Sequence, residues 1–205
     1  MGWYDFIAPL YDLGSAGSGR FRRIAVEQLD AQPGDSVLDL ACGTGLNFPV
    51  VERTVGKAGT LIGLDASRGM LTRARKRVVR HDWRNVHLIR ADARRLDADL
   101  LRERSGIESV DRVLCTLGFS VFPDYRDVFD RSYEVLKRGG RYCIMDWYLE
   151  KRTPFARFLE FVARGEIVGE GRVWRSSWEL LRETNDFTHR TFWGGRIFIC
   201  SGIKP

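Results

Sequence analysis

Short apolar runs alternate with longer amphipathic segments along most of the chain. Each run is typical of a buried strand, because a strand covered on both faces is apolar at consecutive positions. The segments between the runs place apolar residues three or four positions apart, which is the spacing of one helix face. This alternation predicts an α/β fold: an open, doubly wound and mostly parallel sheet. The expected strands are Ser36–Ala41, Thr60–Asp65, Val86–Ala91, Val110–Cys115 and Gly140–Asp146, and the expected helices are Arg20–Ala31, Gly45–Thr54, Ser67–Arg80 and Tyr125–Leu136.

The last third of the chain departs from this pattern. Gly194-Gly195 separates two segments rich in β-branched and aromatic residues, Asp186–Trp193 and Arg196–Ile203. Two glycines between such segments predict a two-residue hairpin turn, so the sheet should end in a C-terminal antiparallel hairpin. The stretch before the hairpin, 148–183, is too long for a simple connection, and we expect it to contain helices at Pro154–Arg164 and near Ser177–Glu183.

The most informative motif runs from the first strand into the following helix, as Leu38-Asp39-Leu40-Ala41-Cys42-Gly43-Thr44-Gly45-Leu46-Asn47. Gly43 and Gly45 allow a tight turn and a close approach of the backbone to a ligand. A dinucleotide site would have a third glycine three residues later, where this chain has Phe48. Asp39, just before the turn, would repel a pyrophosphate. The motif therefore favours a ligand that carries a cationic group.

Two further acidic residues follow the ends of neighbouring strands. Asp65 ends the second expected strand, about 20 residues after Gly45, where a carboxylate can accept both ribose hydroxyls. Asp92 follows the third strand and is placed to accept a hydrogen bond from an adenine amino group. Each acid alone is typical of a helix cap or turn. Three of them at one sheet edge indicate a binding site, because ligands of open α/β sheets bind at the carboxyl ends of the strands.

Together with Gly63-Leu64-Asp65-Ala66-Ser67, the glycine motif resembles class I S-adenosylmethionine-dependent methyltransferases, and the match covers about Tyr4 to Trp147. The resemblance implies a seven-stranded, Rossmann-like sheet and S-adenosylmethionine as cofactor with S-adenosylhomocysteine as product, and the length of the chain predicts a single domain over residues 1–205. The resemblance places the turn beside the amino-acid part of the cofactor and Asp65 at the ribose. The implied cofactor residues are Tyr11, Asp39, Gly43, Thr44, Gly45, Asn47, Asp65, Ala66, Met70, Asp92, Ala93 and Thr116, with Ala66 and Met70 against the adenine, Asp92 and Ala93 at its polar edge, and Thr116 beside the methyl donor.

The opening segment Tyr4–Asp12 is similar to that of a narrower group, which contains quinone-biosynthesis C-methyltransferases and small bacterial phospholipid N-methyltransferases. The resemblance implies that residues 1–19 fold over the cofactor as a lid, with Tyr11 near the sulfonium. The alternative is that these aromatic residues simply cover the core.

The acceptor is harder to choose. The quinone enzymes carry Gly-x-Arg-Asn after the fourth strand, whereas this chain has Gly118-Phe119-Ser120-Val121. We therefore expect a small or lipid-like acceptor, with N-methylation of a phospholipid amine of the phosphatidylethanolamine type as the leading hypothesis and C-methylation of a quinone precursor as the alternative. Tyr11, Asp146 and Tyr148 are the candidate catalytic residues, and none of the three histidines is placed as a base. An apolar acceptor wall is expected from Leu117, Phe119, Val121, Phe122, Trp147, Tyr148, Phe155, Phe158 and Phe161, with Arg152, Arg157 and Arg164 interleaved.

Charge and composition add less. The chain has 205 residues, 33 of them basic against 27 acidic, for a formal net charge of +6. This excess would suit peripheral contact with an anionic membrane, an anionic substrate, or a plain solvated surface. A non-catalytic RNA- or cofactor-binding module is the competing class, but nucleic-acid motifs are absent. The four cysteines are not paired in CxxC spacing, no metal site is expected, and no signal peptide or membrane span is visible, so we expect a cytoplasmic protein.

Overall fold

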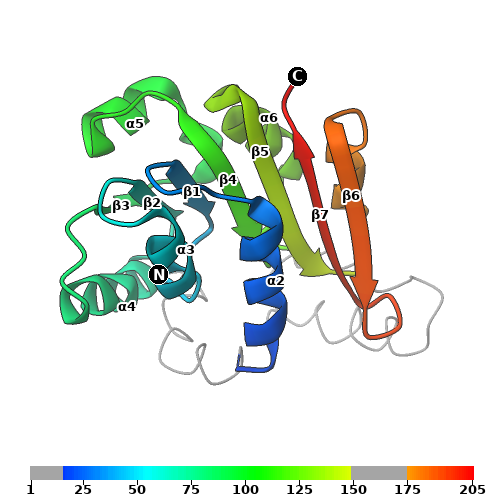
Figure 1. The fold of residues 1–205 in the computed structure, drawn as a ribbon, viewed down its shortest axis with the longest axis horizontal. Helices are drawn as coiled ribbons and strands as arrows, with labels where there is room; N and C mark the ends of the chain where they lie inside the picture. The colour runs from blue at the N-terminus through cyan, green and yellow to red at the C-terminus, as the bar shows by residue number, and fades with distance from the viewer. Residues whose placement is uncertain (1–15, 149–174) are drawn as a thin grey trace.

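The fold is built on one seven-stranded sheet with strand order β3-β2-β1-β4-β5-β7-β6 (Figure 1). The computed structural model describes residues 16–148 and 175–205. Neighbouring strands among β1 to β5 are parallel, whereas β7 pairs antiparallel with both β5 and β6. The strands are β1 (Ser36–Leu40), β2 (Thr60–Asp65), β3 (Val86–Arg90), β4 (Val110–Thr116), β5 (Leu136–Trp147), β6 (Asn185–Phe192) and β7 (Ile197–Ile203). The predicted Rossmann-like sheet and its antiparallel end are confirmed.

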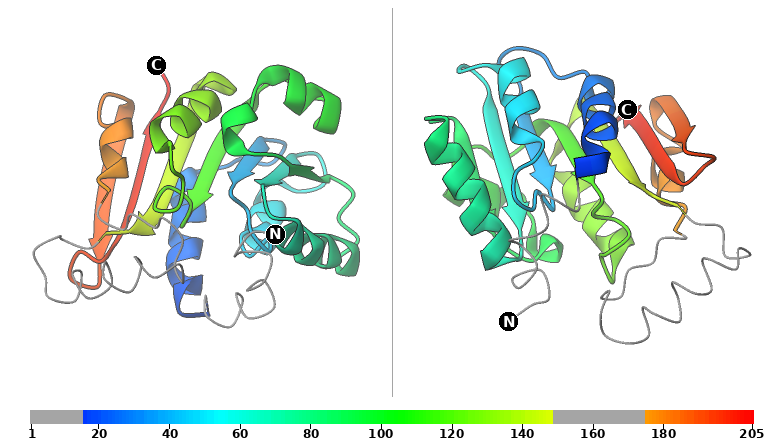
Figure 2. Two further views of the ribbon diagram at one scale, coloured as in Figure 1. Left: turned by 180° about the vertical axis from the view of Figure 1, so that it is seen from behind. Right: turned by 90° about the horizontal axis from the view of Figure 1, so that it is seen from below.

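Helices cover both faces of the sheet (Figures 1 and 2). One hydrophobic cluster joins the sheet to α2, α3 and α4, and a second joins the other face to α5, α6 and η3. We call these the α2 face and the α6 face. The helical elements are η1 (Ala16–Ser18), α2 (Gly19–Leu29), α3 (Phe48–Val55), α4 (Arg68–Arg80), η2 (Ala93–Arg95), α5 (Ala98–Ser105), α6 (Tyr125–Glu134) and η3 (Ser177–Leu181).

Phe48 fills the space between the glycine motif and the second strand. Its side chain is 0% exposed, and a Cβ atom on Gly45 or Gly63 would lie 2.6 Å from its ring. In a dinucleotide fold this position holds a glycine that lets helix and strand pack closely. Here an aromatic ring takes that volume, and burial of such a side chain stabilises the fold by roughly 1.5–3 kcal/mol. Gly63 on the facing strand provides the room for it.

Several element boundaries differ from the sequence prediction. The hairpin turn has four residues, 193–196, closed by the Gly195 N–H donating to the Phe192 carbonyl at 3.1 Å. The prediction of a two-residue turn at Gly194-Gly195 was therefore wrong. Helix α5 was not predicted, because only Leu101 of its eight residues is buried and no apolar repeat marks it.

Other sequence predictions fall on residues outside the described ranges. These are most of the lid segment 1–19 and the helix Pro154–Arg164. Within the described ranges, η3 stands where a helix near Ser177–Glu183 was expected. No helix among these residues is both long and apolar enough to cross a bilayer.

Candidate functional site

The glycine turn links the end of β1 to the start of α3. Its backbone takes positive φ at Ala41 (54°), Gly43 (56°) and Gly45 (77°). The left-handed region is strained for residues with a Cβ atom, and at Gly45 the ring of Phe48 also blocks that atom. Because of this turn, α3 begins at Phe48 rather than at Gly45 as predicted. The turn brings backbone groups, rather than side chains, to the carboxyl edge of the sheet.

Beneath the turn lies a buried polar network that reaches across the α2 face. The Asn47 amide donates to both carboxylate oxygens of Asp39, at 3.0 and 3.1 Å, and to Thr116 Oγ1 at 3.0 Å. Arg22 of α2 donates to Asn47 Oδ1 at 3.2 Å, to Thr116 Oγ1, and to Ser18 Oγ at 3.0 Å. The network thus connects α2, β1, α3 and β4 at one point.

Sequence reasoning missed Arg22, although a signal was present. Arg22 is only 7% exposed, and it shares its helix face with Ala25, Val26 and Leu29. A charged residue on the apolar face of an amphipathic helix is rarely buried without a partner. The positive charge of its guanidinium group is complementary to a ligand carboxylate.

Asp39 has no exposed surface, so its charge acts on a ligand through its neighbours. Burial raises the pKa of Asp39 from 3.8 to about 7, although the Asn47 hydrogen bond and the charge of Arg22 oppose the rise. The nearby carboxylate of Asp65 raises it further. A carboxylate this costly to ionise is typical of functional sites.

Asp65 ties the end of β2 to the glycine turn. Its Oδ2 accepts from the Gly43 N–H at 2.8 Å, and its Oδ1 accepts from the Ser67 N–H at 2.8 Å. Ser67 in turn caps α4 by accepting from the Met70 N–H at 3.1 Å. Next to this carboxylate, Ala66 is exposed and Met70 is 2% exposed. The residues implied for the ribose and one side of the adenine therefore lie together.

Asp92 stands at the end of β3 and is already paired. Arg94 donates to both of its carboxylate oxygens, and this contact lowers the pKa of Asp92. Arg94 also pairs with Asp124, at 3.1 Å, just before α6. Beside Asp92, Ala93 is 5% exposed.

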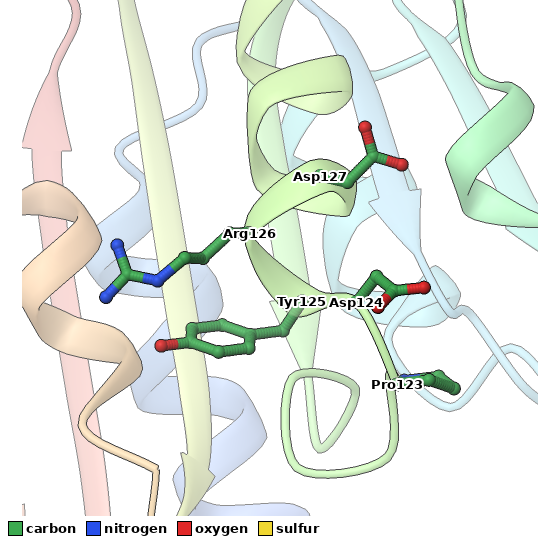
Figure 3. Close-up of a pocket in the computed structure, with 5 residues that line it drawn as sticks. All are labelled: Pro123, Asp124, Tyr125, Arg126 and Asp127. Atoms are coloured by element: carbon green, nitrogen blue, oxygen red, sulfur yellow. The ribbon is translucent and has the colours of Figure 1, made fainter.

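A surface hollow of about 480 Å³ lies at the start of α6. Figure 3 shows Tyr125 and Arg126 extending to one side of the first helical turn and Asp124 and Asp127 to the other. The lining residues are Pro123, Asp124, Tyr125, Arg126 and Asp127. None of the implied cofactor residues that the structure describes lines this hollow, so the candidate site is defined by the strand ends and not by it.

The loop after β4 is held by Asp146, on the α6 face. Its Oδ2 accepts from the Ser120 N–H and its Oδ1 accepts from Ser120 Oγ and the Trp147 N–H, each at 2.8 Å. Asp146 is 1% exposed, and burial raises its pKa to about 6. These contacts favour a positioning role for Asp146, and its direct contact with an acceptor stays a prediction.

The expected apolar wall is only partly formed by the residues named for it. Phe119 is 0% exposed and packs against Phe122 and Tyr142, so it belongs to the core. Tyr148, the other described candidate for catalysis, packs edge-on against Trp178, with ring centroids 4.8 Å apart. The half-buried apolar residues at this edge are Leu117, Val121, Phe122, Trp147 and Tyr148. Tyr11, Phe155, Phe158, Phe161, Arg152, Arg157 and Arg164 lie outside the described residues.

The residues at this edge fit the cofactor implied by the resemblance. Asp65 and Asp92 stand where the resemblance places the ribose and the adenine amine, whereas the buried Asp39 and Arg22 belong to the network beneath the glycine turn. Bound S-adenosylmethionine supplies an electrophilic methyl group on a positively charged sulfur. The protein would hold it through the turn and these side chains, and would align the acceptor and exclude water. No cluster of three or more potential metal ligands occurs among the described residues.

Comparisons with known proteins identify the family and the fold. Residues 37–140 match a family described as "Methyltransferase domain". A demethylmenaquinone methyltransferase from Shouchella clausii is 27% identical over 224 residues, covering 98% of this chain and 92% of that protein. An arsenite methyltransferase from Halobacterium salinarum is 35% identical over 124 residues, covering 60% of this chain and 29% of that protein. The structure of a SAM-dependent methyltransferase from Aquifex aeolicus superposes with a TM-score of 0.60 at 15% identity, covering 90% and 89% of the two chains.

Proposed function

Since this chain belongs to the methyltransferase domain family and is a class I S-adenosylmethionine-dependent methyltransferase, we propose that it methylates a ring carbon of a reduced quinone precursor. The observation that carries the proposal is the extent of similarity to a demethylmenaquinone methyltransferase, which takes in 98% of this chain. The similarity thus extends beyond the cofactor motif to nearly the whole chain, which includes the residues expected to form the acceptor wall. This similarity favours the quinone precursor over the phospholipid amine, although the sequence alone had made the phospholipid amine the leading hypothesis.

The loop after β4 is the main departure from the quinone enzymes. Ser120 stands where those enzymes have the arginine of the Arg-Asn pair. It donates hydrogen bonds to the Asp146 carboxylate through its N–H and its hydroxyl. This pair fixes the loop next to Leu117, Val121 and Phe122, which are half-buried. Such a lining suits an uncharged aromatic ring better than a charged headgroup.

Arsenite is a poorer acceptor for this chain. Trivalent arsenic is a soft centre that is held by thiolates, as other soft ions are. All four cysteines of the sequence are buried, and burial raises the pKa of each thiol. No thiolate is therefore offered at the candidate site. The arsenite methyltransferase match, which covers 29% of that protein, supports only the shared cofactor core.

The test offers three acceptors in parallel to the purified protein with methyl-labelled S-adenosylmethionine. These are a reduced prenylated naphthoquinol, phosphatidylethanolamine vesicles, and arsenite with a thiol reductant. We expect the label in the naphthoquinol only, on a ring carbon located by mass spectrometric fragmentation. The oxidised quinone is the matched control, because its ring carbon is not nucleophilic. Label in phosphatidylethanolamine, or equal transfer to oxidised and reduced rings, would contradict the proposal.

A further inference from the structure

The tip of the β6–β7 hairpin carries an exposed tryptophan at the same edge of the sheet as the candidate site. Trp193 is 56% exposed, and among the described residues Val79 is the one other large hydrophobic side chain with such exposure. The hairpin turn follows the carboxyl end of β5, because Trp147, the last residue of that strand, pairs with Ile197 at the start of β7. Figure 1 shows β4 and β5 running downward, with the hairpin turn and the start of α2 below the ends of both strands. A single exposed apolar residue is common on protein surfaces, so the significance of Trp193 depends on its backbone conformation and on the charge around it.

Trp193 packs against other aromatic rings on its protein-facing side. The Phe21 ring meets it edge-on at 4.9 Å, and the Trp147 ring lies 6.0 Å away. Phe21 also packs against Phe192, at 5.3 Å. The indole is thus supported on its inner side and open on its outer side. A side chain held in this way loses little conformational entropy when it enters another phase.

The backbone at Trp193 is costly for this residue type. Its φ is 51°, in the left-handed region, where Gly, Asn and Asp are the less strained choices and a bulky residue is an outlier. Gly194 and Gly195 follow with φ of 64° and 86°. Strain kept at an exposed tip points to a role for the side chain outside the fold.

Positive charge surrounds the indole. Arg20 and Arg23 are exposed on α2 beside Phe21, and Arg190 and Arg196 are exposed on either side of the turn. The segments 16–26 and 187–205 contain no acidic residue. No ion pair within the described ranges engages these four arginines. We call them, together with Trp193, the tip patch.

We propose that the tip patch docks the protein onto an anionic lipid bilayer, with Trp193 entering the headgroup region. Tryptophan is enriched at membrane interfaces because its ring is apolar and its N–H is polar. Arginines close to an anionic surface add attraction that salt weakens. The proposal rests on the proposed function in one respect: an acceptor with a prenyl tail resides in the bilayer, and the patch brings the carboxyl edge of the sheet toward it.

The test measures binding without acceptor or cofactor, so its failure is distinguishable from failure of the quinol assay. Full-length protein is sedimented with sucrose-loaded vesicles of phosphatidylcholine alone or with phosphatidylglycerol added. We expect at least roughly tenfold stronger partitioning onto the anionic vesicles, reduced at high salt. W193N, in which asparagine tolerates the positive φ, should weaken partitioning roughly tenfold. R190Q/R196Q should weaken it about 30-fold, from about 1 kcal/mol for each arginine near an anionic surface.

Matched variants on α4 separate the tip patch from general charge or apolarity. V79N removes the other large hydrophobic side chain that is exposed within the described ranges, and R75Q/R80Q removes two exposed arginines that have no ion pair with a described residue. Both should bind vesicles like the wild type. The proposal is overturned if these controls lose as much as the tip variants, or if binding ignores phosphatidylglycerol. It is also overturned if the tip variants instead lose affinity for a single-stranded RNA oligonucleotide while no variant binds vesicles.

Discussion

At the scale of single residues, Asp39 makes the stability of the protein depend on pH. Its pKa is about 7 in the folded protein against an ordinary value of 3.8. Because the folded state holds this proton more tightly, the associated stability is complete below about pH 4 and is lost as the pH rises through 7. D39N cannot titrate. We therefore expect the free energy of unfolding of the wild type, relative to D39N, to fall between about pH 4 and 8 by at most about 4 kcal/mol.

Urea unfolding at a series of pH values measures this difference. D99N is the control, because Asp99 is 74% exposed in its pair with Arg102, and pairs of that kind contribute little to stability. Parallel pH curves for the wild type and D39N would mean that Asp39 has an ordinary pKa in the folded protein.

At the scale of elements, the glycine turn between β1 and α3 requires a residue without a side chain at Gly45. In G45A the new methyl group would meet the Phe48 ring at 2.6 Å, at a φ of 77°. We expect G45A to lose at least about tenfold in affinity for S-adenosylhomocysteine, measured by calorimetry, because the backbone must move away from the ligand.

G34A provides the matched control for this turn. Gly34 also has positive φ, 91°, but its Cβ would meet no atom within 4 Å. G34A should cost about 1 kcal/mol of stability from the backbone alone and leave the affinity unchanged. Equal loss of affinity in both variants would contradict the claim that the contact with the Phe48 ring causes the loss in G45A.

The loop after β4 and the end of β5 form a second coupled element. D146A leaves the Ser120 N–H and hydroxyl without their acceptor, so we expect a stability loss of about 2–3 kcal/mol. Turnover should fall more than about threefold, roughly 0.7 kcal/mol of barrier, with unchanged affinity for S-adenosylhomocysteine. D186N is the control, because it removes only the charge of the half-exposed pair with Arg141, and asparagine tolerates the φ of 50° at this position. Turnover of D146A within threefold of wild type would contradict a role in positioning this loop.

The same elements explain how much could be predicted from sequence. The strands β1 and β2 were recognisable because both of their faces are buried, so that apolar residues occupy consecutive positions. Edge strand β3 is only partly buried and was recognised from a shorter apolar run. Helix α5 was not predicted because it buries a single leucine. Among site residues, the strand-end acids follow from topology. The helix pattern indicates that Arg22 lies on an apolar face, but its partner Thr116, 94 positions away, follows from no local pattern. The core position of Phe119 depended likewise on distant Tyr142.

At the scale of the whole molecule, ligand binding should raise thermal stability selectively. A ligand at 100 times its Kd stabilises the folded state by about 2.7 kcal/mol, and for a chain of this size that raises Tm by about 5–10 °C. We expect this shift with S-adenosylhomocysteine and none with NAD, because Phe48 and Asp39 oppose a pyrophosphate. A shift with NAD alone would overturn the cofactor assignment. G45A, which folds without a suitable turn, should show a smaller shift than G34A.

The buried thiols have a practical consequence for work on this molecule. Cys42, Cys115, Cys143 and Cys200 are between 0% and 5% exposed, and thiol reagents react with the accessible thiolate. Maleimide should therefore label the native protein only as fast as the structure opens. A cysteine introduced at an exposed position can then carry a single fluorophore or spin label without removal of the natural four. The natural thiols, left in place, report unfolding in the same sample.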